Sequence, residues 1–258
     1  MKKTLLEKTA DKLVNAFVNN KIIAPLPIKF TKTLSEAQKL RKLCESKVKD
    51  PIIGFKAAGT GIPVMKKLKE KKPFYAAIFK KNFIKSGKKV KINKSTLGIE
   101  LEVCYLIKKN FFSSKGLITT KNITKHISHM AACIEVIGYR QKKKGITSFG
   151  DLCSDFGANV KFLIGQKKKY KKINIGNLKT NIANKKIGQS VNGNTNTVYI
   201  NPLNSLRFVL NELKKDKVTL DKDFYVFTGS TVGVVPILGK GLYTGKVDQL
   251  GSAKAIIH

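Results

Sequence analysis

Residues 97–105 read Leu-Gly-Ile-Glu-Leu-Glu-Val-Cys-Tyr, a stretch in which apolar and acidic side chains alternate. Successive side chains of a β-strand point to opposite faces, so the alternation predicts a strand with Ile99 and Leu101 on one face. Glu100 and Glu102 would then lie side by side on the other face. Neighbouring carboxylates repel each other unless they face water, share a proton or bind a cation. A hard divalent ion such as Mg²⁺ or Mn²⁺, which prefers carboxylate oxygens, is the most specific of these explanations.

A third acid, Glu135, lies in the apolar run Cys133-Ile134-Glu135-Val136-Ile137-Gly138, which predicts another strand. A solvent-facing strand position is the simplest interpretation of this acid. However, the chain has 51 Lys and Arg residues against 16 Asp and Glu residues, so its exposed charge is mostly lysine. An acid inside an apolar run is therefore unusual here, and a hard-metal site would use such a third carboxylate.

Lys56 interrupts a different apolar stretch, residues 52–61, which reads as a short strand followed by a glycine-rich turn. Glycines permit close approach of the backbone, so a lysine beside them is a candidate functional cation. A lysine on an edge strand or a solvated face would give the same pattern. The position of Lys56 alone leaves both interpretations open.

The net charge of +35 would by itself suggest a nucleic-acid partner. Only three of the 51 basic residues are arginine, whereas proteins that read phosphates and base edges depend on the arginine fork. Lysine, asparagine and isoleucine are all abundant, as an AT-rich coding sequence would produce. Coding composition is therefore the favoured explanation, and we expect no nucleic-acid partner. A lysine-rich nucleic-acid-binding protein remains the alternative from another functional class.

Helical periodicity predicts helices over residues 4–19, 35–46, 120–130 and 202–213. Apolar runs predict strands at 74–79, 97–105, 133–138 and 224–227, besides the strand and turn of residues 52–61. Thr4 with Glu7, and Ser35 with Gln38, would form capping boxes. Residues 241–257 alternate and turn at Leu250-Gly251 like a hairpin. Strands that do not alternate regularly with helices indicate an α+β fold.

The predicted organisation is an N-terminal helical lid or support segment, residues 1–70, followed by a catalytic β domain, residues 71–258; the two would also be compatible with one domain. No run approaches the roughly 18 apolar residues of a membrane span, and charged residues interrupt the N-terminus, so we expect a cytoplasmic protein. The four cysteines are widely spaced and form no CxxC pair. They are expected to be small buried apolar side chains.

His126 and His129 lie three residues apart on a predicted helix and could face one way as metal ligands. No carboxylate lies at matching spacing, so a partly exposed pair is the favoured interpretation. The sequence contains no P-loop, dinucleotide fingerprint, HExxH or GxSxG motif.

Taken together, these motifs resemble the fumarylacetoacetate hydrolase superfamily, and within it the 2-keto-4-pentenoate hydratase branch. The resemblance covers most of the chain. Its markers are Gly54-Phe55-Lys56, Ile99-Glu100-Leu101-Glu102-Val103, Ile134-Glu135-Val136 with Arg140, Asp155, Asn201-Pro202-Leu203, Gly229-Ser230 and Leu250-Gly251-Ser252.

The resemblance implies a mixed β-roll or β-sandwich with flanking helices and a homo-oligomer with a site inside each subunit. It also implies that Glu100, Glu102 and Glu135 hold Mg²⁺ or Mn²⁺, which would act as a Lewis acid toward a small 2-oxo acid. Lys56 would pair with the substrate or move a proton. Ser230 and neighbouring amides would contact the substrate carboxylate. Asp155 and Asn159 would lie near the pocket wall. The implied reaction is the hydration of a 2-hydroxyalka-2,4-dienoate to a 4-hydroxy-2-oxo acid.

The chain departs from the family pattern around these residues. The usual Asp-Asn-Ala-Ser-Ser run is Asp155-Phe156-Gly157-Ala158-Asn159 here, so the expected hydroxyls are missing. Thr231 stands one position earlier than in the common pattern, which would turn it out of the pocket. An acid often found three residues after the third ligand is Gly138 here. The substrate is therefore less well specified than the metal ligands.

Two other reactions of the superfamily remain open. An acylpyruvate or related diketo-acid hydrolase would resemble its relatives in using a His and Glu pair on the N-terminal lid, but all three histidines here follow the metal strand. That order favours lyase chemistry. A 2-oxo-acid decarboxylase would need the same metal without the addition of water, and the motifs do not separate it from a hydratase.

Overall fold

The structure is a computed structural model that describes residues 2–93, 95–142, 145 and 147–258. Among these residues no helix has the length and apolar character that crossing a membrane requires. The helices are α1 (Leu5–Asn19), α2 (Leu34–Lys47), α3 (Ile62–Lys67), α4 (Phe149–Ser154) and α5 (Pro202–Lys215).

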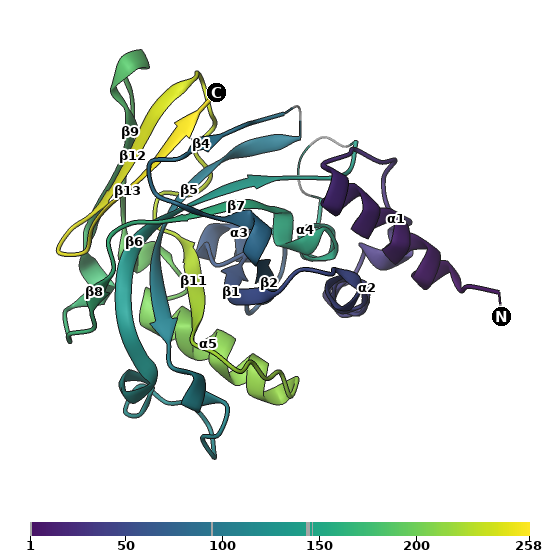
Figure 1. Ribbon diagram of the computed structural model, residues 1–258, viewed down its shortest axis with the longest axis horizontal. Coiled ribbons are helices and arrows are strands. Elements are labelled where there is room, and N and C mark those ends of the chain that lie inside the picture. The colour runs from purple at the N-terminus through teal and green to yellow at the C-terminus, as the bar shows by residue number, and fades with distance from the viewer. Residues whose placement is uncertain (1, 94, 143–144, 146) are drawn as a thin grey trace.

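The strands form two sheets. The larger sheet has the order β2-β1-β11-β5-β6-β7-β3, with β8 also pairing with β6, and the smaller one has the order β10-β9-β12-β13-β4. Their bounds are β1 (Ile52–Ala58), β2 (Phe74–Phe79), β3 (Phe83–Lys85), β4 (Lys89–Val90), β5 (Thr96–Ile107), β6 (Ile127–Gly138), β7 (Asn159–Ile164), β8 (Lys168–Lys169), β9 (Lys179–Asn184), β10 (Gln189–Asn194), β11 (Phe224–Ser230), β12 (Gly241–Val247) and β13 (Gly251–Ile257). Figure 1 shows β9, β12 and β13 at one end of the molecule and α1 and α2 at the other.

The main core lies between the two sheets. Ile99 and Leu101 of β5 are fully buried there, in one cluster with side chains of β9, β12 and β13. A Cβ on Gly245 of β12 would lie 2.5 Å from Leu101 Cδ1, so the sheets approach closely at this point. Burial of each such aliphatic side chain contributes about 1.5–3 kcal/mol. This face of β5 is the one that the alternating sequence predicted.

The opposite face of the larger sheet curls around a second, smaller cluster. Its buried members come from five strands and are Ile78, Cys104, Cys133, Phe162 and Phe227. Side chains from β2 and β7, near opposite ends of the strand order, thus meet across the curl. The predicted α+β fold with a rolled sheet is confirmed, and the acids of β5 face the inside of this curl.

Two helix starts agree with the sequence and one does not. Thr4 and Glu7 form the predicted capping box of α1, and Asn201 caps α5 ahead of Pro202. The predicted start of α2 at Ser35 was wrong, because Thr33 Oγ1 accepts the Glu36 N–H and the helix begins at Leu34. Thr33 has the extended conformation of an N-cap, whereas Ser35 already lies inside the helix.

The helix predicted over residues 120–130 was also wrong. A 3₁₀ turn, Ile123–His126, is followed directly by β6, which pairs with β5 along most of its length. Pairing with a long neighbouring strand overrides the weak helical periodicity of so short a segment. His129 therefore lies on a strand, and His126 is buried with its ring edge-on to Phe111. The two histidines do not form a helical pair.

The larger sheet joins the two predicted segments of the chain. β1 belongs to residues 1–70 but lies between β2 and β11 in that sheet. Division of the chain at residue 70 into separate folding units stays a prediction. The C-terminal hairpin is present as β12 and β13, and all four cysteines are buried free thiols, as expected.

Candidate metal centre

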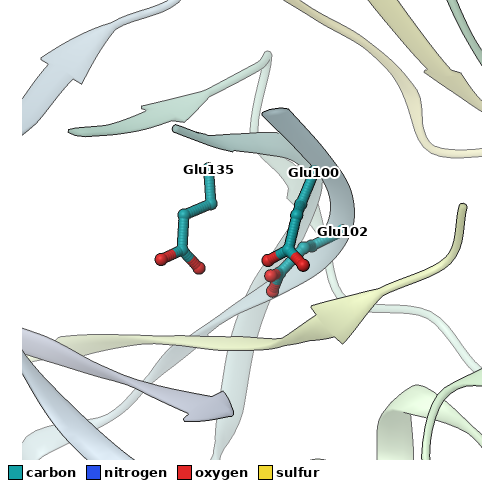
Figure 2. Close-up of side chains that lie close together, drawn as sticks. All are labelled: Glu100, Glu102 and Glu135. Atoms are coloured by element: carbon teal, nitrogen blue, oxygen red, sulfur yellow. The ribbon is translucent and has the colours of Figure 1, made fainter. Parts of the chain in front are cut away.

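Three glutamates meet on the inner face of the curled sheet. β5 and β6 pair so that Glu100 lies directly opposite Glu135, and Glu102 is the next residue of β5 on the same face. Each offers a carboxylate oxygen, and these oxygens all lie within 4.8 Å of one another. Figure 2 shows Glu100 and Glu102 side by side and Glu135 facing them. The alternation of β5 thus places two acids on one face, and the β5–β6 register adds the third.

The acids are buried, and two of their oxygens have no partner among the described residues. Glu102 and Glu135 are 0% exposed, whereas Glu100 is half-buried and borders a cavity. Glu102 Oε2 accepts the Gly229 N–H at 2.7 Å, but Glu102 Oε1 and Glu135 Oε2 accept no hydrogen bond. A buried, unpaired carboxylate oxygen is costly unless a cation or a proton satisfies it.

Burial also disfavours ionisation of all three acids. It raises the pKa of Glu100 to about 8, with further help from the charge of Glu135. It raises the pKa of Glu102 well above its ordinary value, where repulsion from both other acids adds to the effect. Burial raises the pKa of Glu135 as well, although Lys56 opposes the shift. A divalent cation would remove this penalty, and three carboxylates are the donor set that Mg²⁺ or Mn²⁺ prefers. The residues present fit such an ion.

Lys56 lies on β1 with its side chain directed at the acids. Its Nζ donates to Glu135 Oε1 and, at 3.0 Å, to the Gly157 carbonyl oxygen. Burial lowers the pKa of Lys56, but the three acids outweigh burial and hold this pKa above its ordinary value. Lys56 is therefore a buried cation, not one of the many surface lysines.

The segment that departs from the family pattern supplies the carbonyl that Lys56 contacts. Phe156, Gly157 and Ala158 have φ values of 52°, 65° and 60°, which place three successive residues in the left-handed region. This conformation is unfavourable for the two residues that carry a side chain, at about 1–3 kcal/mol each. The strained segment lies beside the buried cation Lys56. Strain of this kind is commonly found at functional sites.

A cavity of about 140 Å³ opens beside the acids. Lys56 and Glu100 are the charged residues among those that line it. The other lining residues are small or aliphatic except for the hydroxyls of Thr60 and Ser230: Ala57, Ala58, Gly59, Thr60, Gly61, Val64, Ile137, Leu152, Gly157, Ala158, Gly229, Ser230, Gly233 and Val234. The cavity could hold a small molecule with its polar end at the acids and an apolar end along the wall.

The predicted substrate residues occupy different places. Ser230 lines the cavity, where its Oγ donates to the Gly233 carbonyl at 2.7 Å. Asp155 is buried against Arg140 and accepts the Arg140 backbone N–H at 2.7 Å. Asn159 donates from Nδ2 to the Ala77 carbonyl at 2.9 Å. Neither Asp155 nor Asn159 is among the residues that line the cavity, and both are buried.

Gly229 has a role that the motifs did not predict, whereas Thr231 lies as its shifted position predicted. Gly229 has φ +104°, and a Cβ there would lie 1.9 Å from Thr60 Oγ1, so only glycine can bring its N–H to Glu102. Thr231 turns away from the cavity, and its Oγ1 donates to the Leu101 carbonyl at 2.9 Å. The sequence signal for the conformation at Gly229 is the glycine itself, directly before Ser230 in the Gly229-Ser230 motif.

Comparison with known proteins identifies the fold of this chain. No protein-family model matches the sequence, and no curated protein sequence matches it. The structure is similar to that of 4-oxalocrotonate decarboxylase from Pseudomonas putida G7 with magnesium and adipate, at a TM-score of 0.83, 19% identity and 100% coverage of both chains. The same enzyme with calcium and acetate gives a TM-score of 0.81 at 19% identity, again over 100% of both chains.

A more distant match is 5-carboxymethyl-2-hydroxymuconate delta-isomerase from Mycobacterium smegmatis, at a TM-score of 0.54 and 13% identity, covering 81% of this chain and 80% of the other. A putative fumarylacetoacetate isomerase/hydrolase from Oleispira antarctica also matches, at a TM-score of 0.57 and 12% identity, covering 80% of this chain and 94% of the other. The resemblance expected from the motifs is confirmed at the level of the fold, and similar structures contain divalent metal ions.

Proposed function

We propose that this chain is a divalent-metal-dependent lyase that adds water to a small 2-hydroxyalka-2,4-dienoate and yields a 4-hydroxy-2-oxo acid. The observation that carries the proposal is the cluster of Glu100, Glu102 and Glu135 with the buried cation Lys56 at one end of a mostly aliphatic cavity. This arrangement suits an acid that binds by an oxygen-rich head and leaves an apolar tail along the wall.

The three glutamates would hold Mg²⁺ or Mn²⁺, which when bound would supply Lewis-acid stabilisation of negative charge on the substrate's 2-oxygen. Gly229 would keep Glu102 in place through its backbone N–H. Lys56, a cation within reach of the acids, would pair with the substrate or move a proton from the 2-hydroxyl to C5 of the dienoate, a transfer with no net gain or loss of protons. The substrate would then carry a 2-oxo group conjugated to the double bond between C3 and C4, and water adds to that bond.

Water can reach this double bond from the open side of the cavity. Val64 and Val234 line the cavity and are 43% and 49% exposed, so they mark its mouth. Addition places a hydroxyl on C4 and a proton on C3, and the overall change is the gain of one water molecule. The aliphatic residues deeper in the cavity would hold the dienoate so that this carbon faces the mouth.

Decarboxylation is the second candidate, and one observation favours it. The structural likeness to 4-oxalocrotonate decarboxylase extends over the full length of both chains. That reaction would use the same acids and Lys56 and would need no water. Hydrolysis of an acylpyruvate is less well supported, because His126, His129 and His258 are absent from the described cavity lining.

The proposal is tested by assaying the Mg²⁺- or Mn²⁺-loaded protein separately with two substrates, 2-hydroxypenta-2,4-dienoate and 4-oxalocrotonate. Loss of the dienoate ultraviolet absorbance, with 4-hydroxy-2-oxopentanoate identified by NMR, is the expected result. Release of CO₂ from 4-oxalocrotonate without hydration of the dienoate would replace the proposal by the decarboxylase. We also propose a homo-oligomer, which light scattering of the same sample tests.

A further inference from the structure

Among the described residues, no basic side chain lines the end of the cavity remote from the acids. We infer that the substrate's far end is uncharged and aliphatic, and that Val64 and Val234 at the cavity mouth select it. The inference rests on the proposed function, because it takes the 2-oxo acid head of the substrate to lie at Glu100, Glu102 and Glu135. It concerns the substrate side chain, which the motifs leave undefined.

The cavity has a polar end and an apolar end. Lys56 and Glu100 lie at the polar end, beside the other two acids. Ile137 and Leu152, which are 5% and 9% exposed, form part of the wall, and the half-exposed Val64 and Val234 form the mouth. A cavity of about 140 Å³ is close to the size of an apolar cavity that holds one benzene molecule, roughly 150 Å³. It therefore suits a head and a short tail that ends near the two valines.

A terminal carboxylate would find no free cation on this path. Within the described part of the chain, Lys56 is the only basic residue that lines the cavity, and its Nζ already donates to Glu135 and Gly157. The hydroxyl of Ser230 donates to the Gly233 carbonyl. A carboxylate against aliphatic side chains loses hydration without gaining a partner, so its binding is weakened. An alkyl end gains from burial of its apolar surface.

This preference separates the chain from a protein of the same fold. 4-Oxalocrotonate decarboxylase is described with adipate, a six-carbon dicarboxylate. Selection of the same kind of diacid by this chain would require a second basic side chain along the cavity wall. The described residues, 2–93, 95–142, 145 and 147–258, place none there. The apolar mouth instead favours a monocarboxylate.

The test measures binding and not turnover. Isothermal titration of the Mn²⁺-loaded protein compares 2-oxohexanoate with 2-oxoadipate, which share the 2-oxo acid head and the six-carbon chain and differ in the terminal group. We expect 2-oxohexanoate to bind at least tenfold more tightly. A preference below tenfold would overturn the inference while leaving the proposed function intact. Failure of both acids to bind would overturn the proposed function, and the inference with it.

Two lysine substitutions test whether the mouth selects the tail. Val234→Lys adds a cation at the mouth and should tighten 2-oxoadipate about two- to fivefold, the range of an exposed charge pair. Leu238→Lys is the matched control, because Leu238 is 72% exposed, follows closely in sequence and is not a cavity residue. It adds the same net charge and should leave both affinities unchanged. Equal effects of the two variants would assign the change to net charge and overturn the role of Val234.

Discussion

Glu102→Gln should make the metal-free protein more stable and remove the stabilisation that metal gives. Glutamine has the shape of glutamate, and its amide oxygen can still accept the Gly229 N–H that Glu102 Oε2 accepts at 2.7 Å. Its amide group would replace Glu102 Oε1, which has no partner, and could donate to a neighbouring acid. The substitution therefore replaces an unpaired buried oxygen by a hydrogen-bond donor without opening a cavity.

The magnitude follows from the cost of the unpaired oxygen. A buried polar group without a partner costs about 1–3 kcal/mol, so the variant should gain about 2 kcal/mol in the absence of metal. For a domain of this size that gain raises Tm by about 4–8 °C. With Mn²⁺ at one hundred times its Kd, the unsubstituted protein gains about 2.7 kcal/mol, which the variant should largely lose.

The assay is thermal unfolding, followed by circular dichroism at pH 8, with either a chelator or excess Mn²⁺. The variant should melt higher than the unsubstituted protein with the chelator and lower with Mn²⁺. Glu36→Gln, an exposed acid that pairs with Lys39, is the control and should respond to Mn²⁺ as the unsubstituted protein does. A Glu102→Gln protein that is less stable with the chelator and gains fully from Mn²⁺ would show that Glu102 is neither a costly buried acid nor a metal ligand.

Three further predictions concern the same site. Lys56→Met should lower turnover at least tenfold and change Mn²⁺ affinity much less, as steady-state kinetics and calorimetry would show; unchanged turnover would remove Lys56 from the reaction. Gly229→Ala should weaken Mn²⁺ binding in calorimetry, since a Cβ would lie 1.9 Å from Thr60 Oγ1 and displace the N–H from Glu102; unchanged affinity would show that this hydrogen bond is dispensable. Without metal, the folded protein holds a proton on Glu100 up to a pKa of about 8, whereas the unfolded chain releases it near the ordinary 4.5. The contribution of Glu100 to stability is therefore present below about pH 4.5 and is lost as the pH rises toward 8, which a pH series of urea unfolding without metal checks; stability that rises throughout this window would contradict it.

The sequence was sufficient for the strand that carries the site. The period-2 alternation around Glu100 and Glu102 is a local signal that depends only on neighbouring residues. The structure has a strand there, β5, with the alternating residues on its two buried faces. Glu135 was predicted as a third acid, but its position opposite Glu100 depends on the β5–β6 register, which no local pattern states. The helix predicted over residues 120–130 failed for the same reason, because pairing between strands decided the structure there.

Other features of the site depend on backbone conformations that the residue types do not predict. Phe156 and Ala158 adopt left-handed conformations that are rare for residues with side chains, so the Gly157 carbonyl at Lys56 could not be foreseen. Asp155 and Asn159 were predicted near the pocket wall, and in the structure both side chains form hydrogen bonds with backbone groups. Their role toward a substrate stays a prediction.

The metal centre is tested most simply by calorimetric titration of the protein with Mn²⁺, beside a Glu100→Gln, Glu102→Gln double variant. We expect one binding event in the unsubstituted protein and none in the variant, with both proteins folded by circular dichroism. An unchanged titration in the folded double variant would contradict the claim that these acids form a metal centre.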